Sequence, residues 1–353
     1  MTGPLLSVSG LRTTFDTPRG VITAVDGIDF EINRGETVCL VGESGSGKTV
    51  ACESITRLIA SPPGEITDGR VVFDGQNVLD CSSRELREIH GNKIAYVFQN
   101  PQNALDPVYT VGAQVAESVQ FHQDVSDGVA KERAIDLLDR VGIPKAEVRS
   151  NDYPHEFSGG MRQRVVIAMA LAGEPDLLIA DEPTTALDVT IEAQILDLLR
   201  DLQDERDMAI LFVTHDLGVV AEIADRVVVM YAGKVMERGD VRAIFDQPSH
   251  PYTQALLACL PGQGNGLQPI GGSMADPISP PAGCRFHPRC PHAIDTCARN
   301  GQPPLQGVRN DQKASCIFHR SDRDSSVVLD ETERESGEAE EAGDAERTRG
   351  NVR

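Results

Sequence analysis

Apolar and polar positions follow two periods along the chain and divide it into expected strands and helices. Residues 6–33 alternate between apolar and polar side chains, which is typical of short strands in a twisted sheet. Apolar runs at 37–41, 177–180 and 209–213 have the length of buried strands, while residues 129–141 show a helical pattern. Because strands and helices alternate, the sequence predicts an α/β fold with a mainly parallel sheet and a helical insertion.

A glycine-rich loop, G-E-S-G-S-G-K-T at 42–49, lies between the apolar run at 37–41 and a helical run at 48–59. This order of strand, loop and helix fits the phosphate-binding motif G-x-x-x-x-G-K-[ST]. Glycines let backbone N–H groups turn around phosphate oxygens, and the start of the helix adds positive potential. We expect Lys48 to reach the β- and γ-phosphates and the Thr49 hydroxyl to bind Mg²⁺. The other expected nucleotide-binding residues of the loop are Gly42, Ser44, Gly45 and Gly47.

Two carboxylates follow the apolar run at 177–180. Asp181 would hold the Mg²⁺ shell, and Glu182 would orient and polarise the attacking water. An acidic pair is also common at the end of an ordinary strand, so this interpretation depends on the phosphate-binding loop elsewhere in the chain.

The segment F-S-G-G-M-R-Q-R at 157–164 lies between these two features. It resembles the signature of the ABC ATPases, LSGGQ, with Phe157 and Met161 in place of its Leu and Gln. Ser158, Gly159 and Gly160 offer a hydroxyl and backbone amides at a helix start, a second anion site. In the family the signature of one subunit covers the ATP held by the other. The resemblance therefore implies a head-to-tail dimer, closed by two ATP molecules and opened by hydrolysis.

The same resemblance assigns roles to four further residues. Gln99 matches the glutamine loop, which contacts Mg²⁺ and water and couples the ATPase to its membrane partner. Asp188 matches the D-loop of the dimer interface, and His215 matches the switch histidine at the γ-phosphate. Phe15 stands where the family has an adenine-stacking aromatic; a core phenylalanine is the alternative. The implied catalytic residues are thus Glu182, His215 and Gln99.

The C-terminal third of the chain indicates one group within the ABC ATPases. Residues 248–257, P-S-H-P-Y-T-Q-A-L-L, resemble the segment after the ATPase core in peptide and nickel importers, and residues 283–291 resemble their C-terminal extension. The family implies a P-loop NTPase ABC cassette at 1–240, with a mainly parallel sheet, an antiparallel β subdomain and a helical subdomain at about 100–174. A small cysteine-containing C-terminal module would occupy 241–320. The acidic tail, 321–353, has few large apolar residues, and we expect it to be disordered.

Four of the eight cysteines, Cys284, Cys290, Cys297 and Cys316, lie close together in the sequence. Four thiolates can hold a [4Fe–4S] cluster or a tetrahedral Zn²⁺. The paired C-x2-C knuckles usual in zinc sites are absent, and members of the resembled group carry an iron–sulfur cluster at such cysteines. That cluster is the preferred interpretation. Zinc stays open because His287, His292 and His319 are near, and absence of any metal stays open too.

Charge and hydropathy restrict the partners. A net charge of −21, from 54 acidic against 33 basic residues, disfavours nucleic acid, whose phosphates a binding protein must neutralise. It is also compatible with a host of high internal salt, or simply with an acidic protein. The chain has no apolar run long enough to span a bilayer and no secretion signal, so any tie to a membrane would come through a partner.

Together these features indicate the ATP-hydrolysing subunit of an importer, peripheral at the cytoplasmic face of the cell membrane. The resemblance implies two transmembrane permeases, a second ATPase subunit in a homo- or heterodimer, and an extracytoplasmic solute-binding protein. Peptides are the expected cargo, with nickel or an oligosaccharide as alternatives. A soluble ABC ATPase of DNA repair, chromosome organisation or translation is disfavoured, because no long coiled coil and no second cassette is present.

Overall fold

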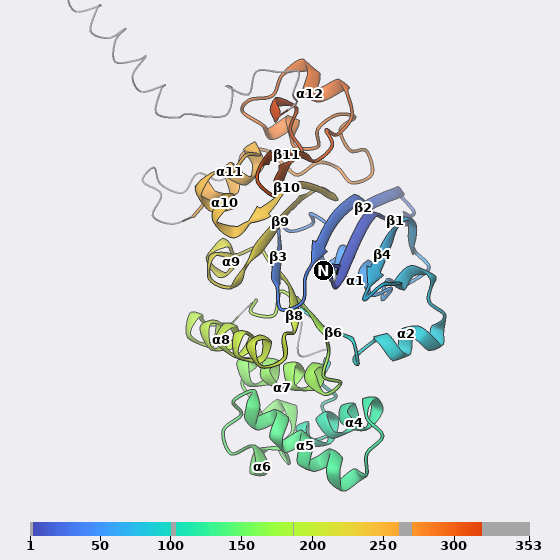
Figure 1. Ribbon diagram of the computed structural model, residues 1–353, viewed down its shortest axis with the longest axis vertical. Coiled ribbons are helices and arrows are strands. Elements are labelled where there is room, and N and C mark those ends of the chain that lie inside the picture. Colours follow the sequence, from blue (N-terminus) through green and yellow to red (C-terminus); the bar gives the residue numbers. More distant parts are fainter. Residues whose placement is uncertain (1–2, 100–103, 186, 261–269, 320–353) are drawn as a thin grey trace, which may run out of the picture.

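The computed structural model describes residues 3–99, 104–185, 187–260 and 270–319. Figure 1 shows an elongated arrangement of these residues, with the main sheet in the middle and a four-stranded sheet beside it. A group of helices lies at one end and the C-terminal elements lie at the other. The loop at 42–49, between β3 and α1, therefore lies in the central part of the molecule.

The main sheet has the strand order β11-β12-β10-β9-β3-β8-β7-β6, and the pairs from β9 to β6 are parallel. This confirms the predicted mainly parallel sheet. Alternate side chains of its strands enter two different cores: in β3, Cys39 and Val41 pack on one face, and Val38 and Leu40 pack on the other. Burial on both faces explains why these strands are continuous apolar runs. The parallel strands are β3 (Thr37–Val41), β6 (Ile94–Val97), β7 (Leu177–Asp181), β8 (Ala209–Thr214) and β9 (Arg226–Tyr231).

The second sheet is antiparallel, in the order β2-β1-β4-β5. The strands expected to be short are long here, with 12 residues in β1 and 13 in β2. Its strands are β1 (Leu6–Thr17), β2 (Gly20–Ile32), β4 (Gly64–Phe73) and β5 (Gln76–Asn77).

Helix α1 (Lys48–Ile55) follows the phosphate-binding loop and packs against this second sheet through a hydrogen bond between the hydroxyls of Thr13 and Ser54, 2.7 Å apart. It ends at Ile55, four residues before the predicted end at 59. Arg57 has a φ of +54°, which the right-handed helix cannot contain, so the apolar pattern beyond Ile55 belongs to the turn that leads into β4.

Most of the remaining helices are placed by the apolar pattern and by side-chain caps. Helices α4, α5, α6 and α7 form the helical end seen in Figure 1, within the predicted insertion. Thr110, Ser158 and Asp188 are the N-cap residues of α4, α7 and α8, and each side chain accepts a hydrogen bond from a first-turn N–H. These helices are α2 (Ser83–Ile89), α4 (Val111–His122), α5 (Asp127–Arg140), α6 (Ala146–Arg149), α7 (Gly159–Leu171), α8 (Val189–Arg206) and α9 (Leu217–Ile223).

The C-terminal region joins the main sheet directly, because β12 pairs with β10 and carries β11 beyond it. The fully buried carboxylate of Glu237 in β10 accepts the N–H groups of Ser249 and His250, at 2.7 and 2.9 Å, and the amide of Gln312 at 2.7 Å. The elements here are β10 (Lys234–Asp240), α10 (Val241–Asp246), α11 (Pro251–Ala258), α12 (Asp295–Arg299), β11 (Gln306–Arg309) and β12 (Gln312–Ala314).

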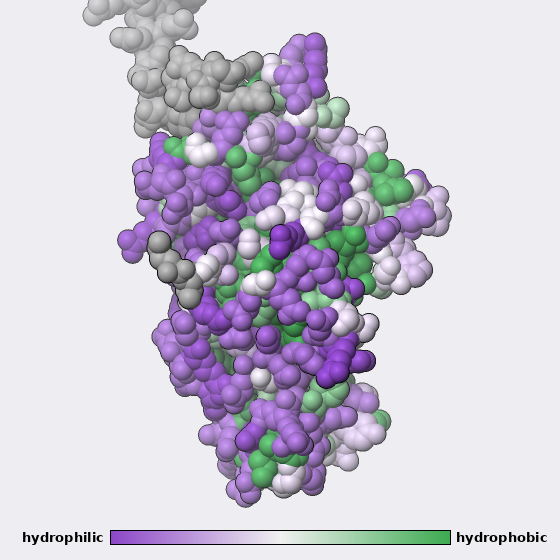
Figure 2. Space-filling model, turned by 45° about the vertical axis from the view of Figure 1, so that its right-hand side comes forward, coloured by the Kyte–Doolittle hydropathy of each residue, from purple (hydrophilic) through white to green (hydrophobic). Residues whose placement is uncertain are grey.

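Of the linker expected at 261–281, residues 261–269 lie outside the described residues, and 270–281 contain no helix or strand. The tail expected at 321–353 also lies outside them. On the face shown in Figure 2 the surface is mostly hydrophilic, with hydrophobic atoms in small separate patches.

Candidate functional site

The phosphate-binding loop, residues 42–49, connects β3 to α1 and needs glycine at two close approaches. Gly42 has a φ of +153°, and a Cβ there would lie 2.1 Å from the carbonyl oxygen of Met230. Gly47 has a φ of +101°, and a Cβ there would lie 2.3 Å from the carbonyl oxygen of Ala24. Any side chain at either position would push the loop away from the sheet, so the glycine spacing of the motif has a steric cause.

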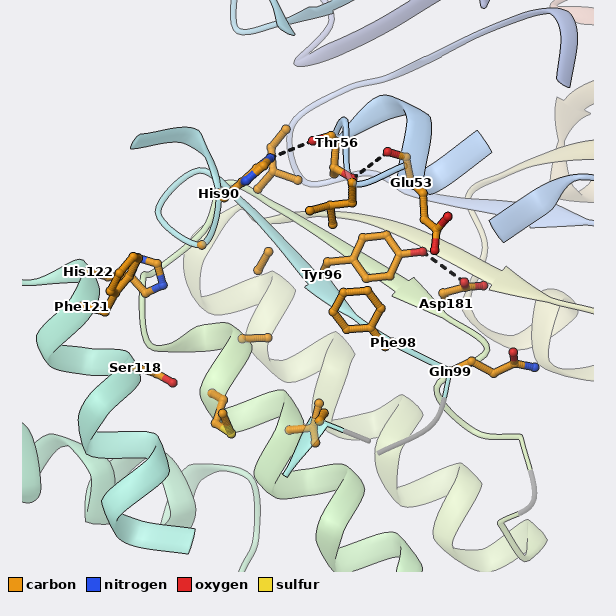
Figure 3. Close-up of a pocket in the computed structure, with 18 of the residues that line it drawn as sticks. Glu53, Thr56, His90, Tyr96, Phe98, Gln99, Ser118, Phe121, His122 and Asp181 are labelled. Atoms are coloured by element: carbon orange, nitrogen blue, oxygen red, sulfur yellow. Dashed lines mark hydrogen bonds between the residues drawn. The ribbon is translucent and has the colours of Figure 1, made fainter. Parts of the chain in front are cut away.

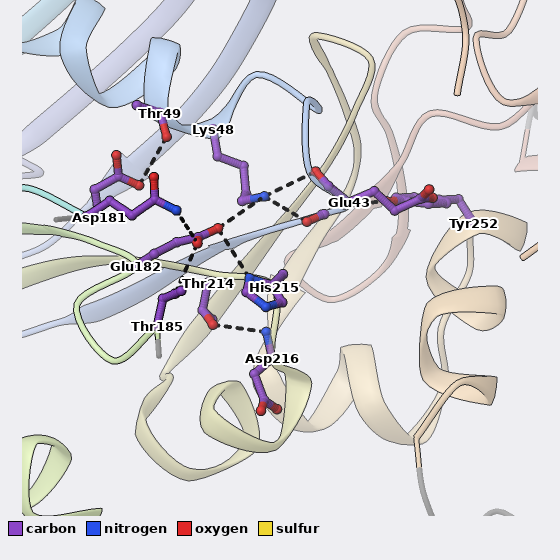
Figure 4. Close-up of polar contacts among 12 residues, drawn as sticks. Glu43, Lys48, Thr49, Asp181, Glu182, Thr185, Thr214, His215, Asp216 and Tyr252 are labelled. Carbon is purple, nitrogen blue, oxygen red and sulfur yellow. Dashed lines mark hydrogen bonds and ion pairs between the residues drawn. The ribbon is translucent and has the colours of Figure 1, made fainter. Parts of the chain in front are cut away.

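Lys48 turns back over this loop (Figure 4). Its Nζ donates hydrogen bonds to the carbonyl oxygens of Gly42, at 2.8 Å, and of Glu43, at 3.2 Å. The Nζ also lies 4.0 Å from Oε1 of Glu182. Burial lowers the pKa of Lys48, while the carboxylates of Glu182 and Asp181 oppose that shift. The loop thus holds a buried cation close to the carboxyl end of β7.

Thr49, the residue after Lys48, contacts Asp181 at the end of β7. The Thr49 hydroxyl donates to Oδ1 of Asp181 at 3.3 Å, and the Tyr96 hydroxyl donates to Oδ2 at 3.1 Å. Burial raises the pKa of Asp181, and the two hydrogen bonds counteract that effect. A hydroxyl and a carboxylate are oxygen ligands of the kind that Mg²⁺ prefers, so these residues fit the expected metal.

Glu182 is the centre of a polar cluster formed by residues of four segments. Its Oε2 accepts from Nε2 of Gln99 at 2.8 Å and from the Thr185 hydroxyl at 3.1 Å, and its Oε1 lies 3.3 Å from Nδ1 of His215. Burial raises the pKa of Glu182, but the contacts with His215, Thr185 and Lys48 outweigh it, so the pKa lies below its ordinary value. An ionised carboxylate in this position can accept a proton or orient a water.

Ser158, Gly159 and Gly160 lie at the start of α7, apart from the phosphate-binding loop. Ser158 begins α7, and its hydroxyl accepts the N–H of Met161 at 3.3 Å. Asp188 begins α8 and accepts the N–H of Ile191 at 3.0 Å, and a Cβ on Gly160 would lie 2.4 Å from Ile191. The structure therefore places Gly160, at the start of α7, against the first turn of α8, while Figure 1 places α7 away from α1.

Phe15 lies near the end of β1, half-buried, opposite Ile22 of β2 and Gly64 of β4. This places it in the antiparallel sheet, two residues from the Thr13 hydroxyl that contacts α1. Stacking of its ring on adenine stays a prediction.

A pocket of about 760 Å³ opens between the site and the helical end of the molecule (Figure 3). Thr49, Gln99 and Asp181 are among its lining residues, and Figure 3 shows Phe121 and His122 of α4 on the side away from Gln99 and Asp181. The rings of Tyr96 and Phe98 are 4.5 Å apart and form one wall. The Phe98 and Phe121 side chains are exposed, at 45% and 71% of their surface.

The four clustered cysteines line one small pocket at the C-terminal end, which we call the thiol pocket. None of the described cysteines forms a disulfide, and burial raises the pKa of Cys284, of Cys290 to about 11 and of Cys316 to about 12. Within the described part of the chain, no group of three or more histidine, cysteine, aspartate or glutamate side chains already has the arrangement of a metal site. The chemistry of four thiols suits a soft metal, but their placement alone does not identify one.

Sequence patterns missed several polar partners of the site. Tyr96 and Thr185 contact the two carboxylates, and Tyr252 of α11 accepts the N–H of Glu43 at 3.0 Å. Only Tyr96 carried a signal, since it is a polar-tipped residue in the apolar strand at 94–97.

A phosphate-binding loop after β3, an acidic pair at the end of the parallel strand β7 and a capped glycine pair at the start of α7 define the class of P-loop ATP-binding cassettes. A family model described as ABC transporter matches residues 25–185, and one described as the C-terminal region of oligopeptide/dipeptide transporters matches residues 236–297. The chain belongs to the ABC transporter ATP-binding proteins and is an ABC-type ATPase.

The similar proteins cover almost the whole chain. A putative peptide import ATP-binding protein of Brucella melitensis is 50% identical over 328 residues, which are 89% of this chain and 97% of the relative. The dipeptide transport ATP-binding protein DppD of Bacillus subtilis is 46% identical and covers 92% of this chain and 97% of its own. The oligopeptide transport ATP-binding protein OppD of the same organism is 50% identical, with 82% of each chain covered.

Solved structures show the same cassette. A dimeric ATP-binding cassette in a post-hydrolysis state with ADP and phosphate has a TM-score of 0.61 and 30% identity, covering 67% of this chain and 99% of its own. A cassette from a Clostridium perfringens ABC transporter complex has a TM-score of 0.58 and 30% identity, covering 69% and 91%. Among the described helices, none is long and apolar enough to cross a bilayer.

Proposed function

We propose that this chain hydrolyses ATP to power the import of di- or oligopeptides through a membrane ABC transporter complex. The observation that carries the catalytic part is the cluster around Glu182, in which Lys48, Gln99 and His215 all lie within 4.0 Å of its carboxylate. The cargo is supported by the relatives named for peptide, dipeptide and oligopeptide transport.

Thr49, Asp181 and Gln99 are the residues that would hold Mg²⁺. The ion supplies charge neutralisation at the transferred phosphoryl group when it is bound. Lys48 would leave the loop carbonyls to pair with the β- and γ-phosphates, and the loop amides, with Gly42, Ser44, Gly45 and Gly47, would surround the phosphate oxygens.

Glu182 acts as the base that orients and polarises water. Its pKa lies below the ordinary value, so it is ionised at neutral pH and can accept hydrogen bonds from the nucleophile. Gln99 and His215 approach this carboxylate from two sides and would fix its direction when the γ-phosphate is near.

The second half of each ATP site would come from another ATPase subunit. Ser158, Gly159, Gly160 and Asp188 lie together, apart from the phosphate-binding loop of their own chain, and the similar dimeric cassette supports a two-subunit sandwich. Phe15 would stack on the adenine. The partner is either a second copy of this chain or a related ATPase.

Membrane attachment is proposed to occur through two permease subunits. The pocket of about 760 Å³ is lined by the exposed side chains of Phe98 and Phe121 and by Gln99, which suits a permease helix that must communicate with the site. The chain would thus sit on the cytoplasmic face of the membrane, and an extracytoplasmic binding protein would deliver the cargo.

We propose that the thiol pocket holds a metal centre, with a [4Fe–4S] cluster preferred over zinc. In this scheme residues 1–240 are the cassette, with the helical subdomain at about 100–174, residues 241–320 the cysteine-containing module, and 321–353 an acidic tail. Anaerobic purification followed by iron, sulfide and zinc analysis tests the metal. A colourless protein with one zinc per chain would reject the iron–sulfur assignment.

The transport function is tested by reconstituting the chain with its permeases and binding protein in liposomes. We expect ATP-dependent uptake of a labelled dipeptide or oligopeptide that stops with the Glu182→Gln variant. Uptake of nickel or an oligosaccharide instead would reject peptides as the cargo and leave the importer function standing. A soluble ABC ATPase would be favoured if ATP hydrolysis proceeded without the permeases and did not change when the permeases were added.

A further inference from the structure

The phosphate-binding loop contains an acidic residue whose side chain is paired by an arginine from the C-terminal region. Nη1 of Arg289 lies 2.9 Å from Oε1 and 3.0 Å from Oε2 of Glu43. The Arg289 side chain is only 4% exposed, and Glu43 is 29% exposed. These two residues are 246 positions apart in the sequence, so the contact is a feature of the tertiary fold.

Arg289 is held in place independently of Glu43. Its Nε donates to the carbonyl oxygen of Gly271 at 2.8 Å, and its Nη2 donates to that of Ile270 at 3.0 Å. Its guanidinium also lies over the ring of Tyr231, 5.7 Å from the centroid. The arginine is therefore a fixed donor, and the loop is the element that it can position.

Glu43 is held at its backbone as well. The Tyr252 hydroxyl accepts the Glu43 N–H at 3.0 Å (Figure 4), and the Glu43 carbonyl oxygen accepts from Lys48. The loop segment that carries the phosphate-binding amides is thus tied through one residue to two C-terminal side chains.

Arg285, in the same segment as Arg289, supports the loop from a second direction. Its Nη1 donates to the carbonyl oxygen of Ala232 at 2.6 Å, and its Nη2 pairs with Asp26. The neighbouring Gly233 N–H donates to the carbonyl oxygen of Ser46 at 2.8 Å. The C-terminal segment thus reaches the loop directly through Arg289 and indirectly through Arg285 and the turn at 232–233.

We propose that Arg289 is a positioning residue for nucleotide binding, which neutralises Glu43 and fixes the phosphate-binding loop. This inference rests on the proposed ATP site. The physical reason is electrostatic: an unpaired carboxylate in a loop that receives phosphates would repel them, and the repulsion is strong where solvent is partly excluded. A buried arginine that served only to anchor the C-terminal segment would not require its counterion to belong to this loop.

The test compares ATP affinity in four forms of the full-length protein: the parent, Arg289→Met, Glu43→Gln and the double variant. Binding of a non-hydrolysable ATP analogue is measured by titration, together with KM and kcat. We expect Arg289→Met to weaken binding by about tenfold with a smaller change in kcat, because it leaves a carboxylate unpaired. The double variant should bind more tightly than Arg289→Met alone, since it removes the repelling charge as well.

Two further variants separate this effect from loss of structure. Arg289→Lys keeps a positive charge beside Glu43, although it loses the other contacts of the guanidinium, and should bind more tightly than Arg289→Met. Arg299→Met removes an exposed arginine that pairs with Asp295 in the same region and should leave binding unchanged.

Equal affinity in Arg289→Met and the parent would overturn the inference while leaving the proposed function intact. So would a double variant that binds as weakly as Arg289→Met or more weakly. Failure of the parent itself to bind the analogue would instead reject the proposed ATP site.

Discussion

The ATP site and the thiol pocket are both polar centres of this chain, but they are built from different kinds of structure. Lys48, Asp181 and Glu182 stand at the ends of parallel strands or at the start of a helix that the main sheet fixes. Cys284, Cys290, Cys297 and Cys316 come from loops, a short helix and single turns. The first centre is positioned by the main sheet, and the second depends on local contacts.

The two centres also differ in how their surroundings shift the pKa values of their ionisable groups. Around Glu182, hydrogen-bond donors and a buried lysine lower the pKa of the carboxyl against the effect of burial. In the thiol pocket burial dominates and raises the pKa of three of the four thiols. The ATP site is thus organised for charge in the protein alone, whereas thiolates in the pocket would need a metal to stabilise them.

The strongest way to break this comparison is Glu182→Gln. We expect ATP turnover to fall about thousandfold while nucleotide binding remains, because the amide cannot accept a proton but keeps the size of the side chain. Phosphate release and analogue binding are measured on the same preparation. The bound dimer should also persist longer on size-exclusion chromatography.

Turnover by Glu182→Gln at the parent rate would show that another group acts as the base. Asp181→Asn serves as the comparison. Loss of this carboxylate should weaken Mg²⁺ binding and should not leave a stable ATP-bound dimer.

His215→Ala should lower kcat about a hundredfold and change its pH dependence. The contact with His215 is one of the effects that lower the Glu182 pKa. Without this contact the pKa of Glu182 rises, so the base becomes protonated at a higher pH. The acidic limb of the plot of kcat against pH therefore shifts to higher pH. A profile with an unchanged acidic limb would mean that His215 does not control the ionisation of Glu182. The parent and His215→Gln profiles are measured alongside.

Tyr96→Phe tests a residue that no motif indicated. Removing its hydroxyl leaves Asp181 with one hydrogen bond fewer and raises the Asp181 pKa further, because that bond favours the ionised form. We expect the Mg²⁺ concentration for half-maximal ATPase activity to rise about tenfold, as when an outer partner of a metal ligand is lost. Phe98→Leu, in the same wall of the pocket, is the control for packing; an equal rise there would attribute the effect to the wall.

The sequence could predict that Lys48, Thr49, Asp181 and Glu182 lie close together, because these residues stand in short motifs at strand ends. The runs at 37–41, 177–180 and 209–213 are the strands β3, β7 and β8, and their parallel pairing brings Thr49, Asp181 and Glu182 together. The carboxyl ends of parallel strands meet at one edge of the sheet, so motifs that directly follow such strands come together there.

What could not be predicted are contacts between side chains far apart in sequence. Tyr96, Tyr252 and Arg289 reach the site from three different elements, and none of them stands in a pattern that indicates its partner. The end of α1 was also missed, since the turn at Arg57 is made by backbone conformation rather than by a proline or glycine at that position.

The smallest expected effect belongs to Cys316→Ser, which separates the two centres most sharply. If the thiol pocket holds the proposed metal, the variant should lose it, measured as iron, sulfide and zinc per chain, while KM for ATP changes by less than about twofold. The reason lies in the anchors of Arg289, which are the carbonyl oxygens of Gly271 and Ile270 and the ring of Tyr231 rather than the thiols. A rise in KM as large as that expected for Arg289→Met would mean that the thiol pocket sets the position of the phosphate-binding loop, and the two regions would then form one functional unit.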